Sequence, residues 1–292
     1  DKPVLFSDDC IGPDNKTVID NMKEGDILLL ENLRFYKDEE KNLPEFAEKL
    51  AVYGDIYIND AFGTAHRAHA STEGVTHFIN QCAAGYLMEK ELQYLAYAID
   101  NPKRPLCAIL GGSKISGKID VLDNLLKIAD KIIIGGGMMF TFYKAMGLEI
   151  GKSILEEDKV ELAKEVLEKV KSSGKEFLLP SDIVIADKFD NSAKTIVIPF
   201  DKFSDDTKEW MGMDIGPDTI NKYKEAIINS KTVVWNGPMG VFEMDKFEKG
   251  TFEVANALAE ATKKDAITII GGGDSADAIA KDGLEKEVSH VS

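Results

Sequence analysis

The sequence predicts a doubly wound α/β protein with two domains, and three observations support this prediction. Short apolar runs of strand length alternate with longer segments in which apolar residues recur at helical spacing. Several of these runs are almost entirely Ile, Val and Leu, which is typical of parallel strands covered on both faces. The chain has 292 residues, more than one hydrophobic core usually organises. The pattern therefore favours mainly parallel sheets distributed over two domains.

The individual elements follow from the same alternation. The first domain is expected to contain strands at residues 3–7, 26–31 and 56–60 and a helix at residues 42–52. In the second domain, strands are expected at residues 106–110, 131–134, 176–179, 183–186, 195–198, 232–235 and 266–270. Its helices are expected at residues 118–129, 139–146, 159–172, 217–229 and 247–262.

One segment interrupts the alternation. Residues 83–99 carry a long helical pattern, and Pro102 and Pro105 follow it and end the helix. We therefore expect a first domain over residues 1–82, an interdomain helix and hinge over residues 83–101, and a second domain over residues 102–292.

Composition and charge limit the partners and the compartment. The formal net charge is −16, which argues against wide contact with nucleic acid or an anionic membrane. Cys10, Cys82 and Cys107 are odd in number and have no metal-ligand spacing, so we expect reduced, buried thiols. No secretory signal and no bilayer-length apolar run is present. These features predict a cytoplasmic protein with no nucleic-acid or membrane partner.

The segment from Trp235 to Glu243 is the most informative in the chain. It follows the strand at residues 232–235, so it should lie at the carboxyl edge of the sheet, where ligands bind in open α/β folds. It contains Gly237, Pro238 and Gly240, which allow a tight turn and close approach of a ligand, together with the polar residues Asn236 and Glu243. A tight strand-to-helix turn without a ligand is the alternative.

Three glycine clusters follow other strands of the second domain. They begin at Gly111, Gly135 and Gly271. Each should open a helix at the same sheet edge, where unpaired amides and the helix dipole attract anions. Their coincidence with the Trp235–Glu243 segment favours a phosphate or nucleotide site, although neither GxxxxGK[ST] nor GxGxxG is present.

Charged side chains within these clusters suggest how a polyphosphate is held. Lys114 and Lys118 are four residues apart, so on a helix they would share one face and an anion between them; a solvated basic turn is the alternative. Asp274 follows three glycines and suits Mg²⁺ held mainly by phosphates and water. Alternatively, Asp274 and Ser275 cap the following helix.

The first domain offers two arginines at expected strand ends. Arg34 follows the strand at residues 26–31, and Arg67 follows the strand at residues 56–60. Guanidinium groups suit carboxylate or phosphate, but for either arginine alone a surface ion pair is the better explanation. For His66 and His69 a structural role is expected.

Taken together, these segments closely resemble phosphoglycerate kinase over essentially the whole chain. The matching segments, in the family's order, are residues 31–35, 59–72, 111–119, 135–138, 212–217, 235–243 and 271–275. The resemblance implies reversible phosphoryl transfer between 1,3-bisphosphoglycerate and MgADP, giving 3-phosphoglycerate and MgATP in glycolysis and gluconeogenesis. It also implies two Rossmann-like domains that close about a hinge, in a monomer that uses Mg²⁺.

The resemblance further implies a role for each candidate residue. Arg34 and Arg67 would bind the phosphate of 3-phosphoglycerate, while Lys114 and Lys118 would be catalytic, Lys118 also binding the nucleotide phosphates. Asp274 would hold Mg²⁺. The remaining nucleotide-binding residues would be Gly136, Gly137 and Gly212 at the adenine, Glu243 at the ribose, and Gly112, Asn236, Pro238, Gly272, Gly273 and Ser275 around the phosphates.

Two segments of the family pattern have no counterpart in the sequence. An RxDxN-type segment with a catalytic arginine would precede Asp1, and a glycine-rich STGGGAS-type loop with a final helix would follow Ser292. We therefore expect an incomplete first domain with exposed apolar surface, retained nucleotide affinity, and turnover reduced roughly 10³-fold or more.

Two other functions remain open. A non-catalytic module that binds Mg-nucleotide is the more literal interpretation of these residues. A nicotinamide-dependent dehydrogenase is compatible with the architecture but disfavoured by the missing GxGxxG motif, and a purely structural protein is disfavoured by the glycine-lined turns.

Overall fold

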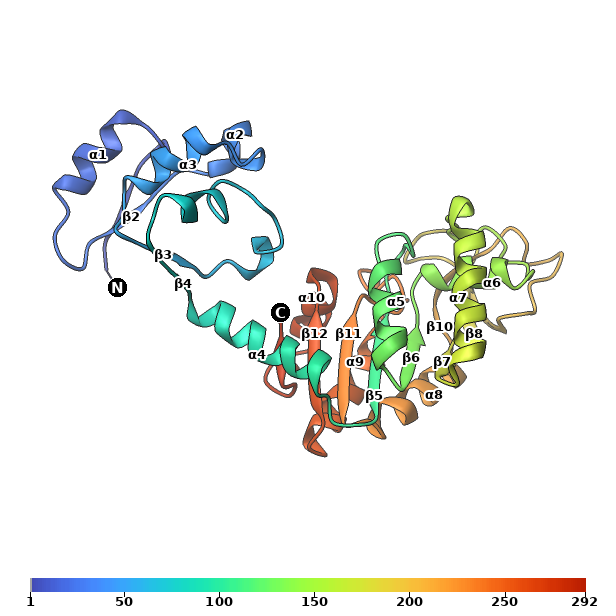
Figure 1. The fold of residues 1–292 in the computed structure, drawn as a ribbon. Helices are drawn as coiled ribbons and strands as arrows, with labels where there is room; N and C mark the ends of the chain where they lie inside the picture. Colours follow the sequence, from blue (N-terminus) through green and yellow to red (C-terminus); the bar gives the residue numbers. More distant parts are fainter. Residues whose placement is uncertain (1) are drawn as a thin grey trace. The chain divides into compact units, whose positions relative to one another are not determined.

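A computed structural model describes residues 2–292, with side chains described for all of these except residues 95–99. The chain divides into two compact units, Asp1–Gln93 and Tyr94–Ser292 (Figure 1). Helix α4 (Tyr86–Asp100) contains the division between them. Within the described residues, no helix combines the length and apolarity needed to cross a membrane.

The second unit is built on a six-stranded parallel sheet. Its strand order is β13-β12-β11-β5-β6-β7. The strands are β5 (Leu106–Leu110), β6 (Lys131–Ile134), β7 (Glu176–Leu178), β11 (Thr232–Asn236), β12 (Ile267–Gly271) and β13 (His290–Val291). From the adjacent central strands β5 and β11 the chain proceeds outward in opposite directions, so their carboxyl ends form a topological switch point.

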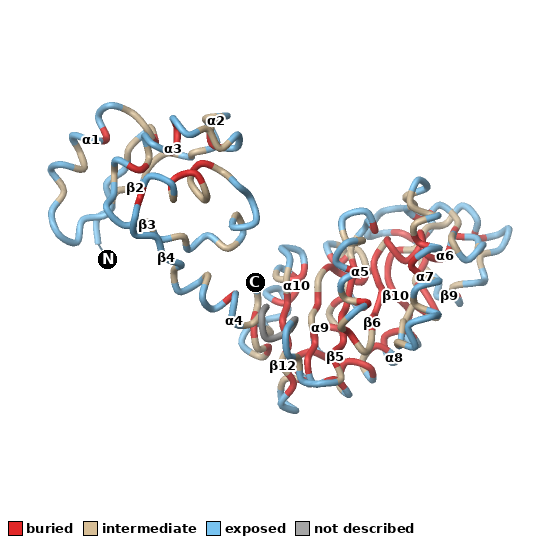
Figure 2. Tube along the Cα trace, viewed as in Figure 1, coloured by how far each residue is buried: buried red, intermediate tan, exposed pale blue. Residues whose placement is uncertain are grey.

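Helices cover both faces of this sheet, as expected for a doubly wound fold. They are α5 (Ile119–Ile128), α6 (Met138–Ala145), α7 (Val160–Ser173), α8 (Pro217–Ile228), α9 (Lys249–Lys263) and α10 (Gly273–Lys281), with a 3₁₀ turn η4 (Glu157–Lys159) before α7. Helix α7 packs on α5 and α6, and α9 packs on α8 and α10; Figure 1 shows α5 and α7 on the near face, with α9 behind. The sheet is buried between them (Figure 2), with Trp235, Tyr143 and Tyr223 fully enclosed.

A second, antiparallel sheet flanks the main one. Its order is β10-β8-β9, formed by β8 (Asp182–Ala186), β9 (Thr195–Pro199) and β10 (Met211–Ile215). The sequence predicted strands at residues 183–186 and 195–198 but not their antiparallel pairing, and it did not predict β10. The sequence of β10, Met-Gly-Met-Asp-Ile, alternates apolar residues with Gly212 and Asp214, but the strand is only five residues long and glycine and aspartate are both depleted in strands.

The first unit has two small parallel sheets. β1 (Val4–Phe6) pairs with β2 (Ile27–Leu29), and β3 (Ile56–Asn59) pairs with β4 (Gln81–Ala84). Short helices accompany them: α1 (Pro13–Asp20), η1 (Leu33–Phe35), α2 (Lys37–Glu40), α3 (Pro44–Ala51), η2 (Phe62–Thr64) and η3 (Gly74–His77). The larger of its two core clusters is small, comprising Cys10, Phe46, Ala47 and Ala70.

Two expectations for this part of the chain need correction. The helix predicted from residue 83 begins at Tyr86, because Ala83 and Ala84 belong to β4. Cys82 was expected to be buried but is exposed on β4, whereas Cys10 and Cys107 are buried as predicted. The expected exposed apolar surface is present: Phe6, Leu29 and other side chains of β1 and β2 are about half exposed or more.

Candidate functional site

Three turns meet at the switch point of the six-stranded sheet. They follow β5, β11 and β12 and carry the cluster at Gly111, the Trp235–Glu243 segment and the cluster at Gly271, respectively. Backbone hydrogen bonds join the first two: the amides of Gly111 and Gly112 donate to the carbonyls of Asn236 (2.9 Å) and Pro238 (2.8 Å). The amide of Gly237 donates to Oγ of Ser275 (2.6 Å), which attaches the third turn.

Close packing explains the glycines at this junction. A Cβ at Gly111 would lie 2.1 Å from the carbonyl oxygen of Pro238. Gly237 has φ +97°, and a Cβ there would lie 2.4 Å from the carbonyl oxygen of Gly111. Larger residues would force the turns apart.

Two adjoining cavities open at these turns. The first, about 450 Å³, is largely apolar, with Met139 and Phe140 buried beneath it. Gly212 is required beside it, since a Cβ there would lie 2.0 Å from the Phe140 ring. Predicted site residues that line this cavity are Gly112, Gly136, Gly137, Gly212, Pro238, Glu243 and Asp274.

The second cavity, about 260 Å³, is polar. It shares Gly112, Ser113 and Asp274 with the first cavity. Predicted site residues that line it are Gly112, Lys114, Lys118, Asn236, Gly272, Gly273, Asp274 and Ser275. The structure therefore brings every residue predicted at the nucleotide into two connected cavities.

Lys118 is the half-buried cation of this second cavity. Its Nζ donates a hydrogen bond to Oδ1 of Asn236. Burial lowers the pKa of Lys118, and the negative charge of Asp274 partly opposes this by raising it. An anion placed here would favour the charged ammonium, which is the electrostatic requirement of a phosphate site.

One geometric expectation about the lysines is wrong. Lys114 and Lys118 do not share a helix face, because α5 begins at Ile119 and Lys118 is its N-cap residue. Residues 114–118 form a turn instead, and Gly117 within it interrupts helical continuity. Both lysines nevertheless line the polar cavity.

The expectation of free amides at every glycine turn is also only partly right. The amides of Gly136 and Met138 donate to the carbonyls of Met239 (2.9 Å) and Gly112 (3.1 Å), so the start of α6 is already paired. At α10, which begins at Gly273, the first-turn amides have no acceptor within the helix and suit an anion. The Ser275 hydroxyl is fully buried and accepts from Gly237, so it braces the turn.

The metal-binding potential of the site depends on Asp274. Among the described residues no cluster of three or more His, Cys, Asp or Glu could hold a metal ion. Asp274 is exposed and lines both cavities. A single carboxylate beside a phosphate pocket fits Mg²⁺ that takes its other ligands from phosphate and water.

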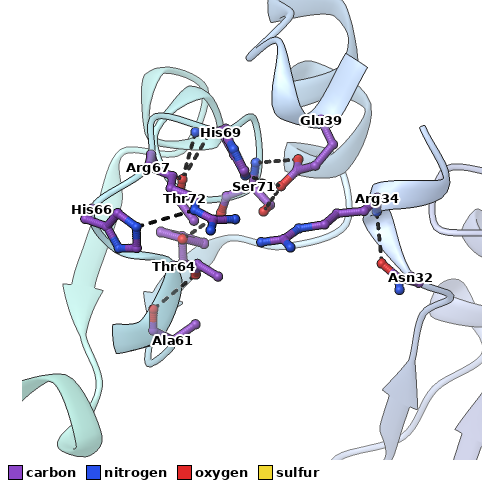
Figure 3. Close-up of polar contacts among 11 residues, drawn as sticks. Asn32, Arg34, Glu39, Ala61, Thr64, His66, Arg67, His69, Ser71 and Thr72 are labelled. Atoms are coloured by element: carbon purple, nitrogen blue, oxygen red, sulfur yellow. Dashed lines mark hydrogen bonds and ion pairs between the residues drawn. The ribbon is translucent and has the colours of Figure 1, made fainter. Parts of the chain in front are cut away.

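The first unit, which carries Arg34 and Arg67, contains a third cavity of about 520 Å³. Arg34 lines it, together with Glu39, His69, Ser71 and other residues. In Figure 3 the guanidinium groups of Arg34 and Arg67 point toward the same space, although Arg67 is outside the cavity lining. Both arginines are exposed, and neither pairs with a carboxylate within the part of the chain that the structure describes. The ion-pair alternative therefore lacks a partner.

Local hydrogen bonds fix the loops that carry these arginines. Asn32 Oδ1 accepts from the amide of Arg34 (3.0 Å), and Thr72 Oγ1 donates to the carbonyl of Arg67 (2.7 Å). Buried Glu39 accepts from the amide of Ser71 (2.9 Å) and from its hydroxyl (2.5 Å). Figure 3 shows these contacts around the arginines. His66 contacts Arg67 through its Nε2 (3.4 Å).

Sequence reasoning missed several lining residues. Apolar side chains give the same signal in a cavity wall as in a core, so spacing could not identify them. In the second unit the missed residues are Met139, Phe140, Ile154, Phe189, Met211, Met213, Met239 and Val241, together with the polar residues Ser113 and Lys152.

Comparison with known proteins agrees with this geometry. A family model described as phosphoglycerate kinase matches residues 1–292. Phosphoglycerate kinase of Chloroherpeton thalassium is 62% identical over 291 residues, covering 100% of this chain and 72% of that protein. The chloroplastic phosphoglycerate kinase of Chlamydomonas reinhardtii is 56% identical over 291 residues, and the chain covers 62% of its length, less than two thirds.

Solved structures give the same result. Phosphoglycerate kinase from Coxiella burnetii matches with a TM-score of 0.83 and 41% identity, over 91% of this chain and 67% of that one. The enzyme from Pyrococcus horikoshii OT3 matches with a TM-score of 0.86 and 32% identity, over 99% of this chain and 73% of that one. Fold, cavities and sequence agree, and the chain belongs to the phosphoglycerate kinase family.

Proposed function

We propose that this chain is the part of a phosphoglycerate kinase that binds both substrates of reversible phosphoryl transfer between 1,3-bisphosphoglycerate and MgADP, as family membership implies. The observation that carries the proposal is the pair of connected cavities at the switch point. One cavity is apolar and suits a purine base, and the other is polar and cationic and suits its phosphates.

The residues of the second unit divide between base and phosphate. The base would enter beside Gly136, Gly137 and Gly212, with Glu243 at the mouth to accept hydrogen bonds from ribose hydroxyls. Lys118 and Lys114 would neutralise the nucleotide phosphates and the transferring group. Catalysis in such a reaction is mostly positioning and charge neutralisation.

Asp274 would hold Mg²⁺ in this site. When bound, the ion would neutralise phosphate charge and fix the geometry of the nucleotide. The first-turn amides of α10, beginning at Gly273, would contact the same phosphates.

In the first unit, Arg34 and Arg67 would bind the phosphate of 3-phosphoglycerate. Each is exposed and unpaired within the described residues, and guanidinium groups suit bidentate phosphate binding. Because the two substrates would be held in different units, we propose that the units close about a hinge during transfer. We further propose that the protein acts in the cytosol, as a monomer, without nucleic-acid or membrane partners.

Binding of Mg-nucleotide without turnover is a second candidate. It is favoured by the location of both nucleotide cavities within the unit Tyr94–Ser292 alone. Isothermal titration with MgADP tests both candidates, because both require binding. A coupled turnover assay with 3-phosphoglycerate and MgATP then separates them.

Arginine variants test the acceptor site. Arg34→Ala and Arg67→Ala should each weaken 3-phosphoglycerate binding about tenfold or more, because a charge-assisted contact is lost. MgADP binding should stay unchanged. Lys23→Ala, an exposed cation of the same unit, is the control. Equal effects of all three variants would contradict a specific role for the arginines.

A further inference from the structure

Residues 150–156, which lie between α6 and η4, contact the walls of both nucleotide cavities. At one end, buried Ser153 accepts a hydrogen bond through Oγ from the amide of Gly212 (2.9 Å), beside the apolar cavity. At the other end, Glu156 contacts the turn that carries Lys114 and Lys118.

Glu156 makes three hydrogen bonds to that turn. Its Oε2 accepts from the amides of Ile115 (2.5 Å) and Ser116 (3.1 Å), and its Oε1 accepts from the Ser116 hydroxyl (2.5 Å). The amide of Glu156 itself lies 3.5 Å from Oγ1 of buried Thr141 on α6, to which it donates. The carboxylate therefore links the turn to a helix of the core.

Apart from Glu156, the turn is anchored by the Ile115 side chain, which is fully buried in the core, and by the amide of Lys118, which donates to the carbonyl of Ile115 (2.9 Å). Gly112 precedes the 114–118 turn and Gly117 lies within it, and glycine gives the backbone wide conformational freedom. A Cβ at Gly117 would meet no atom within 4 Å, so this part of the turn is not packed against a neighbour. Between residues 113 and 117, no amide other than those bound by Glu156 has a partner among the described hydrogen bonds.

We propose that Glu156 is a positioning residue that holds the 114–118 turn so that both lysines face the nucleotide phosphates. This proposal rests on the proposed function and assigns a residue outside the cavity lining to it. Glu156 lines neither cavity and acts through the backbone amides of Ile115 and Ser116 and through the Ser116 hydroxyl.

The direction in which phosphate affinity changes when Glu156 is mutated distinguishes a positioning role from a purely electrostatic one. Glu156 is an anion near a site for anions, so its removal should strengthen phosphate binding if only its charge mattered. If it positions the lysines, removal should weaken phosphate binding. Glu156→Gln keeps the shape, removes the charge, and replaces one accepting oxygen with a donor that cannot pair with an amide N–H.

The matched control is Glu157→Gln. Glu157 is the adjacent residue, is exposed, and has no side-chain contact among the described hydrogen bonds and ion pairs. The unmodified chain and both variants are titrated calorimetrically with MgADP, and adenosine binding is measured by ligand-observed NMR. Adenosine occupies the base cavity without using the lysines.

For Glu156→Gln we expect about tenfold weaker MgADP binding with adenosine binding unchanged, while Glu157→Gln keeps both affinities. MgADP affinity that is equal or higher in Glu156→Gln would overturn the proposal, as would equal losses for MgADP and adenosine. If the unmodified chain fails to bind MgADP, the proposed function fails instead, which is a distinguishable result.

A milder variant allows the proposal to be tested even if Glu156→Gln does not fold. Ser116→Ala removes only the hydroxyl contact to Glu156 and leaves both amide contacts in place. It should weaken MgADP binding by a few fold, again without changing adenosine binding. Unchanged MgADP affinity in Ser116→Ala, when Glu156→Gln does not fold, would count against the proposal.

Discussion

The ammonium of Lys118 donates a hydrogen bond to the side-chain oxygen of Asn236, a residue 118 positions further along the chain. This contact joins the turn after β5 to the end of β11, the two central strands of the sheet. It also directs the half-buried cation toward the polar cavity that both residues line. A lysine held in this way is pre-organised for an anion, because its position is fixed before the ligand arrives.

Replacing Lys118 with methionine should weaken MgADP binding by about tenfold or more, since a charge-assisted contact to phosphate is lost. Lys127→Met, an exposed lysine on α5, provides the matched control and should bind normally. Isothermal titration of both variants gives the comparison. Similar losses in the two would indicate a general charge effect.

The pH dependence of binding should also depend on Lys118. Its pKa lies below the ordinary value because burial disfavours the charged form. As pH rises, this ammonium should lose its proton before ordinary lysines do, and MgADP affinity should decline with it. Titrations from neutral to alkaline pH should show this decline in the unmodified chain and in Lys127→Met, but not in Lys118→Met.

Gly212→Ala should close the base cavity. The new Cβ would lie 2.0 Å from the ring of Phe140, which is fully buried and has little room to move. We expect MgADP affinity to fall at least tenfold and the free energy of unfolding to fall by about 1–3 kcal/mol, the usual cost of overpacking. Binding of inorganic pyrophosphate, which needs only the polar cavity, should be retained.

A tolerated glycine gives the control for this variant. A Cβ at Gly54 would have its nearest contact at 3.6 Å, an ordinary van der Waals distance. Gly54→Ala should therefore leave MgADP binding unchanged. Loss of pyrophosphate binding in Gly212→Ala would mean that the damage extends beyond the base cavity.

Asp274→Ala should remove the Mg²⁺ dependence of nucleotide binding. With Mg²⁺ present, ADP affinity should fall, because the ion loses its protein ligand. With EDTA present, ADP affinity should stay the same or rise, because a negative charge near the phosphates is gone. Asp277→Asn, which removes an exposed carboxylate from the same helix, should show the same Mg²⁺ dependence of ADP affinity as the unmodified chain. A variant that loses affinity equally in Mg²⁺ and EDTA would contradict the assignment.

Local sequence patterns predicted the buried strands well. β5 and β6 begin and end where their apolar runs do, because a strand covered on both faces needs continuous apolar residues. Ala83 and Ala84 of β4 were assigned to a helix because alanine has no strong strand preference, and their strand state depends on pairing with β3. Such pairing cannot be read from neighbours in the sequence.

In the functional site, too, residues required by local backbone geometry were predictable, and residues defined by tertiary contacts were not. Its glycines were recognisable because tight turns and close approach demand them. Phe140 and Met213 were not, since a cavity wall and a core use the same apolar residues. Glu156 gave no signal at all, because its contact with Ser116 depends on folding that joins positions 40 residues apart.

Asp214 should make the second unit less stable as pH rises. This carboxyl is buried, and burial raises its pKa to about 7 from 3.8, although the amides of Gly250 (2.7 Å) and Ile215 (2.8 Å) and the charge of Lys249 act in the opposite direction. Between these two pH values the folded chain keeps a proton that the unfolded chain has released. The stability that the protonated Asp214 carboxyl contributes at low pH is therefore lost as pH rises through this window.

The predicted loss is as large as about 4 kcal/mol, because each tenfold ratio of ionisation constants corresponds to about 1.4 kcal/mol. Asp214→Asn has no such ionisation, but its amide group leaves one backbone N–H without an acceptor. It should therefore be less stable than the unmodified chain near pH 4.5 and should gain relative stability toward pH 8.

Urea unfolding followed by tryptophan fluorescence measures this effect in the relevant unit. The chain's two tryptophans, Trp210 and Trp235, both belong to the unit Tyr94–Ser292. Asp277→Asn should follow the unmodified chain at every pH, because its carboxylate is exposed. If the stability difference between Asp214→Asn and the unmodified chain stays constant from pH 4.5 to 8, the Asp214 carboxyl ionises alike in the folded and unfolded chains. In that case the two amide hydrogen bonds, and not burial, determine its charge.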